Sequence, residues 1–371
     1  MKILKQLLTI LLLLTGSYLK AQTVNLLVGT YTQKGSKGIY LYQLDTITGQ
    51  LKAISHTDSV SNPSYLAISK DKQFVYAVNE DEDGSISAFT LNATKNKLQF
   101  LNKVGTKGAD PCHISISPDE KNIFVANYTG GSLTNFHKFA DGRLSNAQQF
   151  IQHKGSSINP TRQTKAHVHG SFFSPDGKYL LVNDLGMDQT KIYPYQANAN
   201  PPLKASTAIA IQASAGGGPR HLSFSNNGQR IYVLEELSGT ISVYSFYGGI
   251  AKLLQRANTQ STDSKDSPGS ADIHLSPDGK YLYASNRGSE NNLVQYAIDK
   301  NGLLNIASKK HTPSGGVMPR NFTISADGKW LLVANQASDN VVVFKRNISN
   351  GNLTKMPQST MVSMPVCLVL F

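Results

Sequence analysis

One short phrase recurs six times along the chain and constrains its fold more than any other feature. Each copy places a serine before a tight reversal: Ser69-Lys-Asp-Lys, Ser117-Pro-Asp-Glu, Ser174-Pro-Asp-Gly, Ser225-Asn-Asn-Gly, Ser276-Pro-Asp-Gly and Ser325-Ala-Asp-Gly. The copies are separated by 48, 57, 51, 51 and 49 residues. Pro, Asp, Asn and Gly favour turns. A repeat period near 50 residues indicates the blades of a β-propeller rather than unrelated domains.

Runs rich in β-forming residues flank every reversal, so each repeat is predicted to open with a hairpin. Typical runs after the turn are Ile123-Phe-Val-Ala, Tyr179-Leu-Leu-Val and Trp330-Leu-Leu-Val. A third run follows, as in Val341-Val-Val-Phe, and a turn such as Asn301-Gly302 precedes a short outer strand. We therefore expect an all-β fold with four antiparallel strands in each unit.

A seventh unit is predicted to be split between the two ends of the chain. Its N-terminal part starts at Asn25, and its innermost strand is supplied by Met364 to Phe371. Joining this tail to the N-terminal blade closes the ring and removes exposed sheet edges. The residues after position 21 divide into seven units of about 50. We predict one seven-bladed β-propeller domain over residues 22–371, with an eight-bladed ring or an open solenoid as the alternatives.

The first 21 residues have the pattern of a secretory signal rather than of a blade. Lys2 and Lys5 precede an apolar run from Leu7 to Leu14, and small or polar residues lead to Ala21. The apolar run is too short to span a bilayer comfortably. We expect cleavage after Ala21, export to the periplasm or the extracellular space, and no membrane contact afterwards. A retained membrane anchor is the alternative.

The chain carries a formal net charge of +12, which favours an anionic partner. Its basic residues are scattered, and the sequence contains no Lys/Arg block or nucleic-acid-binding motif. We therefore expect a small anionic molecule as the partner, no nucleic acid, and a monomeric protein.

Two cysteines, Cys112 and Cys367, are predicted to lie in the innermost strands of blades that are not neighbours. An exported protein offers conditions in which a disulfide can form. The predicted separation of the two blades instead favours two buried free thiols.

Antiparallel geometry brings the start of each first strand and the end of each second strand to the same mouth of the ring. The residues at first-strand starts are Cys112, His113, His167, His169, Arg220, His221, Asp272 and Arg320. Those at second-strand ends are Asn79-Glu80, Asn127-Tyr128, Asn183-Asp184, Glu235-Glu236, Asn286-Arg287 and Asn335-Gln336. Loops held by a rigid scaffold usually carry function, so we expect the site at this mouth. Strand capping is the alternative role for the asparagines.

Arg220, Arg287 and Arg320 are predicted to form a cluster at this mouth. Guanidinium groups around one axis repel each other unless an anion lies between them, and Arg suits bidentate binding of phosphate or carboxylate. His167 and His169 lie on one strand face, as a metal-binding pair would, but no Cys or Glu-x-x-His motif accompanies them. The sequence therefore predicts neither a metal nor a cofactor.

Several longer stretches carry a family resemblance. They are Asn62-Pro-Ser, His167-Val-His-Gly, Gly218-Pro-Arg-His221, Glu235-Glu-Leu237, Asp272-Ile-His-Leu-Ser-Pro-Asp-Gly-Lys-Tyr-Leu-Tyr-Ala-Ser-Asn-Arg287 and Pro319-Arg-Asn-Phe322. Together they resemble the lactonase family of bacterial propeller-type 6-phosphogluconolactonases and fungal carboxymuconate cyclases. The resemblance implies a metal-independent propeller with the catalytic residues His169, Arg220, Glu236 and Arg287. Further candidates for substrate binding are His167 (also the alternative to His169), His221, Arg320 and Asn127.

The resemblance implies hydrolysis of a small anionic lactone, or binding of a related sugar acid. Arg220 and Arg287 would bind the anionic substituent and the developing oxyanion, and either Glu236 or His169 would accept a proton from the attacking water. Family enzymes with an assigned metabolic role act on cytosolic intermediates, whereas this chain has an export pattern, so the particular lactone stays open. The alternatives are a muconate-type cycloisomerase and a non-catalytic exported binding propeller.

Overall fold

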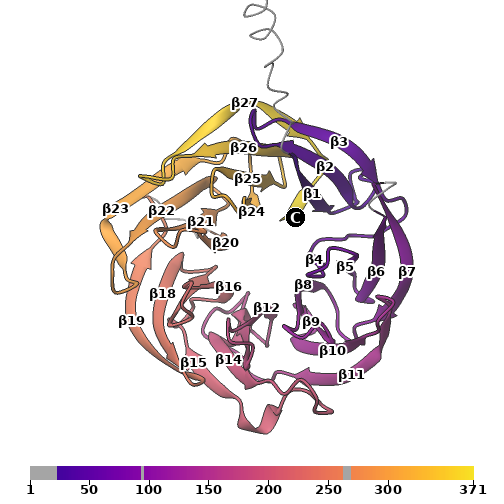
Figure 1. Ribbon diagram of the computed structural model, residues 1–371. Helices are drawn as coiled ribbons and strands as arrows, with labels where there is room; N and C mark the ends of the chain where they lie inside the picture. The colour runs from indigo at the N-terminus through magenta and orange to yellow at the C-terminus, as the bar shows by residue number, and fades with distance from the viewer. Residues whose placement is uncertain (1–22, 93–95, 262–268) are drawn as a thin grey trace, which may run out of the picture.

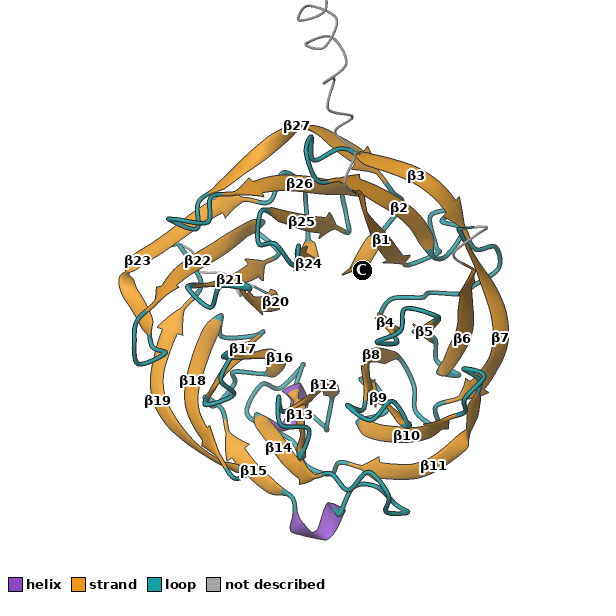
Figure 2. Ribbon diagram, viewed as in Figure 1, coloured by secondary structure: helices purple, strands orange, loops and turns teal. Residues whose placement is uncertain are grey.

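The computed structural model describes residues 23–92, 96–261 and 269–371 and shows seven four-stranded sheets arranged as a ring around a central axis (Figures 1 and 2). Neighbouring strands within the sheets run antiparallel. The described ranges contain two helices, both short 3-10 turns: η1 (Leu185–Met187) and η2 (Ala205–Thr207). The predicted seven-bladed all-β fold is confirmed, and the eight-bladed and open arrangements are excluded.

Blade 1 combines both ends of the chain, and every other blade uses four consecutive strands that follow one another from the axis to the rim. Blade 1 contains β28 (Pro365–Leu370), β1 (Thr23–Thr30), β2 (Tyr40–Asp45) and β3 (Leu51–His56). Blade 2 contains β4 (Leu66–Ile68), β5 (Phe74–Asn79), β6 (Ser85–Asn92) and β7 (Lys97–Gly105). Blade 3 contains β8 (Pro111–Ile116), β9 (Asn122–Asn127), β10 (Ser132–Lys138) and β11 (Leu144–Gln152).

The remaining blades follow the same order. Blade 4 contains β12 (Val168–Phe173), β13 (Tyr179–Asp184), β14 (Gln189–Pro194) and β15 (Ile209–Gln212). Blade 5 contains β16 (Pro219–Phe224), β17 (Arg230–Glu235), β18 (Thr240–Tyr247) and β19 (Ile250–Asn258). Blade 6 contains β20 (Ser270–Leu275), β21 (Tyr281–Asn286), β22 (Asn292–Ile298) and β23 (Leu304–Pro313). Blade 7 contains β24 (Pro319–Ile324), β25 (Trp330–Asn335), β26 (Asn340–Arg346) and β27 (Leu353–Met361).

The recurring serine stabilises each inner hairpin through its own side chain. In blade 4, Ser174 Oγ donates to Asp176 Oδ1 at 2.6 Å and accepts from the backbone N–H of Tyr179 at 3.1 Å. Gly177 has a φ of 69°, a left-handed conformation that glycine adopts without steric cost. The same two serine hydrogen bonds, with Asp or Asn as the acceptor, recur at Ser69, Ser117, Ser225, Ser276 and Ser325. The repeated phrase is therefore a turn that satisfies its own polar groups.

Apolar side chains fill the spaces between neighbouring blades. Between blades 5 and 6, for example, Tyr232 and Leu234 pack with Leu282 and Ala284, and all four are fully buried. Burying a large aliphatic side chain typically contributes about 1.5–3 kcal/mol. The hydrophobic core is therefore a series of layers between the blades, and the axis is left to polar side chains.

β28 closes the ring by pairing with β1. The two strands are antiparallel, with Val28 opposite Leu368. Trp330 of blade 7 packs in the same apolar cluster as Leu26 and Tyr42 of blade 1. Its indole N–H donates to the Thr46 carbonyl at 3.1 Å. The predicted closure by the C-terminal tail is therefore confirmed.

The predicted signal segment, residues 1–21, lies outside the described residues, so export stays a prediction. Within the described ranges, no helix has the length and apolar character that crossing a bilayer requires.

Both cysteines are free and buried, as predicted. Cys112 lies on β8 of blade 3, and Cys367 lies on β28 of blade 1, where its sulfur accepts from the Leu66 N–H at 3.3 Å.

Ring closure generates a stability prediction. Leu368 on β28 is 5% exposed and belongs to the closing cluster. We expect Leu368→Ala to lower the free energy of unfolding by about 2–5 kcal/mol, because it leaves a cavity beside blade 7. Urea denaturation would measure the loss. The matched control is Leu253→Ala on β19, where the side chain is 43% exposed and the change should cost little. Equal losses for the two variants would contradict the role of β28.

Candidate functional site

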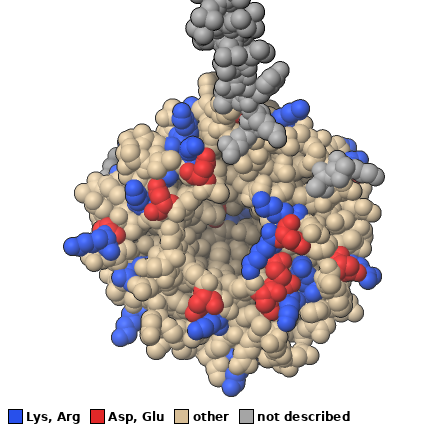
Figure 3. Space-filling model, in the orientation of Figure 1, with Lys and Arg blue, Asp and Glu red and all other residues tan. Residues whose placement is uncertain are grey.

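A polar cavity of about 230 Å³ lies at the mouth where the first strands start and the second strands end. It is lined by Tyr31, Glu80, Cys112, Tyr128, Arg162, His169, Arg220, Glu236, Arg287 and Arg320. All four residues predicted to be catalytic, His169, Arg220, Glu236 and Arg287, are in this set. A space-filling view shows that the ring is hollowed at its centre (Figure 3).

β-bulges at the starts of the inner strands present four of the lining residues. In blade 5, Pro219 pairs with Glu235 and His221 pairs with Leu234, so Arg220 is the extra residue between them. The same shift in register makes Cys112, His169 and Arg320 the extra residues of β8, β12 and β24. Bulges re-aim side chains and are frequent beside active sites. The local backbone therefore turns these four side chains into the cavity.

The end of the second strand supplies four further lining residues in an equivalent way. Glu80, Tyr128, Glu236 and Arg287 each directly follow the last residue of β5, β9, β17 or β21. They come from blades 2, 3, 5 and 6, so residues far apart in the sequence converge at the axis.

Glu236 is the centre of the charge cluster. Its Oε2 accepts from Arg220 Nη1 at 2.9 Å and forms an ion pair with Arg287 Nη2 at 3.1 Å, while Oε1 accepts from Arg162 Nη2 at 2.8 Å. Burial alone would raise the pKa of Glu236, but Arg287 and Arg220 outweigh it and hold that pKa well below its usual range. Glu236 is therefore ionised, and it is itself the anion that separates three guanidinium groups.

Two of these arginines are held rigidly by the backbone. Arg220 Nε donates to the Ala271 carbonyl at 2.6 Å, and Arg287 Nε donates to the Gly269 carbonyl at 2.7 Å. Burial lowers the pKa of Arg287 to about 10, which still leaves it charged at neutral pH. Both side chains thus present fixed N–H groups to the cavity and need not be ordered further when a ligand binds.

His169 lies beside the cluster in its neutral form. Arg220 Nη1 contacts its Nε2, and its Nδ1 is 3.7 Å from Cys112 Sγ. Burial first, and then the charge of Arg220, hold the pKa of His169 well below its usual range. Burial also raises the pKa of the Cys112 thiol, so Cys112 has no thiolate character.

A second carboxylate, that of Glu80, lies beside the fourth arginine, Arg320. Glu80 Oε1 accepts from Tyr31 Oη at 2.8 Å and lies 3.7 Å from Arg320 Nη2. The Arg320 guanidinium also lies over the Tyr31 ring, 5.4 Å from its centroid. The two carboxylates of the cavity therefore neutralise only two of its four guanidinium groups, and the site keeps a surplus of positive charge.

Three of the predicted substrate-binding residues lie outside the cavity lining. His167 is at its edge, where its ring stacks on Tyr128 with centroids 4.5 Å apart. Asn127 is fully buried, and its amide donates to Ser132 Oγ at 3.0 Å and to Thr134 Oγ1 at 3.1 Å. These contacts hold the hairpin of β9 and β10 together, so we do not place Asn127 in the proposed site.

His221, the third of these residues, lies deeper along the axis. Its Nδ1 is 2.8 Å from Asp272 Oδ1, and its ring contacts those of His169, His113 and Phe172. The β-bulge at Arg220 explains why His221 does not line the cavity. It directs Arg220 into the cavity and places His221 beneath the cavity. His221 and Asp272 therefore form the buried support under the site.

Sequence reasoning missed Arg162 and Tyr31 and gave no function to Glu80, Tyr128 or Cys112. Two sequence signals point to two of them, Cys112 and Arg162. A proline precedes three of the four bulge residues, in Pro111-Cys112, Pro219-Arg220 and Pro319-Arg320. The interval of 57 residues between Ser117 and Ser174 contains the additional length that carries Arg162.

The described residues contain no group of three or more His, Cys, Asp or Glu side chains that could hold a metal ion. His167 and His169 therefore lack a third ligand of these types within the described part of the chain.

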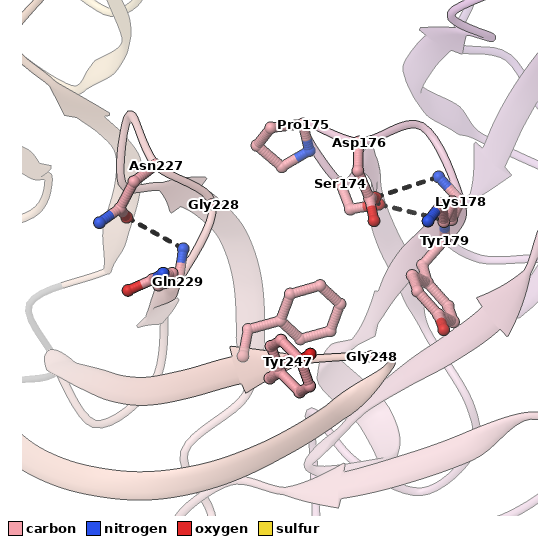
Figure 4. A pocket seen from close by; sticks show the side chains of 11 residues that line it. Ser174, Pro175, Asp176, Lys178, Tyr179, Asn227, Gly228, Gln229, Tyr247 and Gly248 are labelled. Carbon is pink, nitrogen blue, oxygen red and sulfur yellow. Dashed lines mark hydrogen bonds between the residues drawn. The ribbon is translucent and has the colours of Figure 1, made fainter.

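A larger notch between two blades has a different character (Figure 4). It has a volume of about 370 Å³ and lies between the inner hairpin turns of blades 4 and 5, beside Tyr247. Its polar side chains are used within those turns: Asp176 accepts from Ser174 and the Lys178 N–H, and Asn227 accepts from the Gln229 N–H. The converging, incompletely neutralised charges of the axial cavity make that cavity the better candidate for chemistry.

Known proteins resemble this chain over most of its length. The family model described as lactonase, 7-bladed beta-propeller, matches residues 25–370. A 6-phosphogluconolactonase of Formosa agariphila is 38% identical over 350 residues, 93% of this chain and 98% of the relative, and that of Bacillus subtilis is 30% identical over 343 residues, 92% and 96%. The structure of the periplasmic gluconolactonase of Pseudomonas aeruginosa superposes with a TM-score of 0.89 at 36% identity, covering 94% of this chain and 99% of that one. The chain therefore belongs to the family of seven-bladed β-propeller lactonases.

Proposed function

We propose that this protein hydrolyses a small anionic lactone of the gluconolactone type in the axial cavity. The observation that carries the proposal is the cluster of Arg162, Arg220 and Arg287 around the buried carboxylate of Glu236. The names of the relatives, 6-phosphogluconolactonase and gluconolactonase, support the substrate class.

The rigid arginines are placed to stabilise the oxyanion. Water attack on the lactone carbonyl carbon moves negative charge to the carbonyl oxygen. Arg220 and Arg287 already point N–H groups into the cavity and are fixed through their Nε atoms. Preorganised donors of this kind lower the barrier because they need no reorganisation when the charge develops. The anionic substituent then pairs with the remaining positive charge of Arg162 and Arg320.

Glu236 is the better of the two candidate bases. The Nε2 lone pair of His169 already faces Arg220, and its Nδ1 faces Cys112. Glu236 is ionised, and its Oε1 accepts from one protein donor, Arg162, so one lone pair is left for water. Its low pKa makes it a weak base, but it is correctly placed beside the oxyanion donors.

Glu236 both accepts the proton of the attacking water and returns it to the leaving group. The carboxylate takes a proton from the attacking water, and the tetrahedral intermediate breaks the bond between the carbonyl carbon and the ring oxygen. The protonated Glu236 then returns the proton to the leaving alkoxide. The product is an open-chain hydroxy acid, whose carboxyl group releases its proton to solvent to give the anion. Guanidinium cations polarise the carbonyl in this scheme, which requires no metal ion.

Purified protein freed of metals with EDTA should hydrolyse 6-phosphogluconolactone or gluconolactone faster than the buffer does. Arg220→Ala should lower kcat about 10²–10³-fold, because it removes an oxyanion donor. Arg143→Ala is the matched control, since Arg143 is exposed and pairs with Asp141 away from the cavity. Acid release at constant pH measures the rate, and circular dichroism confirms folding. A full rate in Arg220→Ala would refute the mechanism, and turnover of muconate alone would refute the substrate class.

Two substitutions separate the candidate bases. We expect Glu236→Gln to lower kcat/KM about 10²–10⁴-fold, and His169→Gln to lower it less. A base with a depressed pKa is lost only as pH falls through that low value, so wild-type activity should persist from neutral pH down to 4.5 or below. The measurement is kcat/KM against pH for the three proteins. A larger loss in His169→Gln than in Glu236→Gln would assign the base to His169.

We also propose that the protein is exported. The pattern of residues 1–21 favours it, and the related Pseudomonas aeruginosa enzyme is described as periplasmic. N-terminal sequencing of the protein from its native source should begin at Gln22, while a sequence beginning at Met1 would contradict cleavage.

A further inference from the structure

The link between blades 3 and 4 differs from the links between the other blades. It covers residues 153–167 and is the longest connection from an outer strand to the next inner strand. It accounts for the long interval between Ser117 and Ser174 in the sequence repeat. It brings Arg162 to the cavity from outside the inner hairpins, which supply almost all other lining residues.

This link is anchored on both sides of its tip. Ser157 Oγ donates to Asp188 Oδ2 at 2.5 Å, and Gln163 Nε2 donates to Asp188 Oδ1 at 2.6 Å. The backbone closes the loop between them, since the Ser157 N–H donates to the Gln163 carbonyl at 2.9 Å. Asn159 Oδ1 accepts from the Arg162 N–H at 3.0 Å. The backbone of Arg162 is therefore well placed, although its side chain is only partly enclosed.

The Arg162 side chain is held differently from those of the other three arginines. It is 43% exposed, against 4% for Arg220, 11% for Arg287 and 17% for Arg320. Its guanidinium hydrogen bonds to the described residues run through Nη2 alone, to Tyr128 Oη at 3.0 Å and to Glu236 Oε1 at 2.8 Å. Its Nε and Nη1 donors have no protein partner among the described residues. Arg162 is thus the arginine of the cluster that can change partner at the lowest cost.

The net charge of the cavity indicates which kind of ligand would draw Arg162 away from Glu236. Arg220, Arg287 and Arg320 exceed the charges of Glu236 and Glu80 by one, and Arg162 raises this surplus to two. A ligand with one carboxylate neutralises one of these positive charges, and a neutral lactone neutralises none. A phosphate monoester carries close to two negative charges at neutral pH and three acceptor oxygens, which match the free donors of Arg162.

We propose that Arg162 is the specificity-determining residue that selects lactones with a doubly charged substituent, such as a phosphate monoester. When the substituent binds, the Arg162 guanidinium moves from Glu236 Oε1 to the substituent oxygens. Oε1 then loses its protein donor and accepts the proton of the attacking water more readily. A neutral lactone leaves Arg162 on Glu236. This inference rests on the proposed hydrolysis, and it predicts that the substituent charge affects kcat as well as KM.

The test compares 6-phosphogluconolactone with gluconolactone in the wild type, Arg162→Ala, Arg162→Lys and the surface control Arg143→Ala. We expect Arg162→Ala to lower the ratio of kcat/KM for 6-phosphogluconolactone to kcat/KM for gluconolactone about 10- to 100-fold, through both kcat and KM. Arg162→Lys keeps the charge but loses the planar fork of donors, so it should recover part of the ratio. Arg143→Ala should keep the wild-type ratio. An unchanged ratio in Arg162→Ala would overturn the inference while leaving the proposed hydrolysis intact.

A binding measurement separates this inference from the proposed function. Calorimetric titration with 6-phosphogluconate and with gluconate requires no turnover. If the wild type hydrolyses neither lactone, the proposed function fails, and the titration still tests Arg162. Weaker binding of 6-phosphogluconate in Arg162→Ala, with a smaller change for gluconate, supports its role. Equal effects on the two acids contradict it.

Discussion

Closure of the ring by β28 is the constraint on which the rest of the structure depends. It forces the innermost strands of all seven blades to converge on one axis, with their starts at the same mouth. Glu236 can therefore contact Arg220 of its own blade, Arg287 of blade 6, and Arg162, which is 74 residues away in the sequence. An open array would leave its terminal edges unpaired and these blades unconstrained relative to one another.

The charge cluster has two opposing consequences. Burying carboxylates and guanidinium groups costs free energy of solvation, which ion pairing recovers only in part. Glu236 and the backbone carbonyls of Ala271 and Gly269 reduce that cost by accepting hydrogen bonds from the arginines, and Glu80 forms an ion pair with Arg320. Since the carboxylates do not neutralise all four arginines, the cavity remains attractive to anions. The same residues thus make the buried charges tolerable and leave the cavity with a surplus of positive charge.

Three of the four arginines differ in how rigidly they are held. Arg220 and Arg287 are fixed by backbone carbonyls, as the proposed stabilisation of a developing charge requires. Arg162 is half-exposed on a well-anchored loop and can adapt to what is bound.

The sequence by itself determined the architecture and the mouth at which the candidate site lies. Serine turns at a period near 50 residues fixed the blades, and antiparallel pairing placed His169, Arg220, Glu236 and Arg287 at one end of the ring. It could not decide which of two adjacent residues faces the cavity, because a β-bulge breaks the two-residue alternation of a strand. Only the tertiary structure directed Arg220 into the cavity and His221 beneath it. Only the tertiary structure brought Arg162 to Glu236, because no periodic pattern fixes the path of a long link.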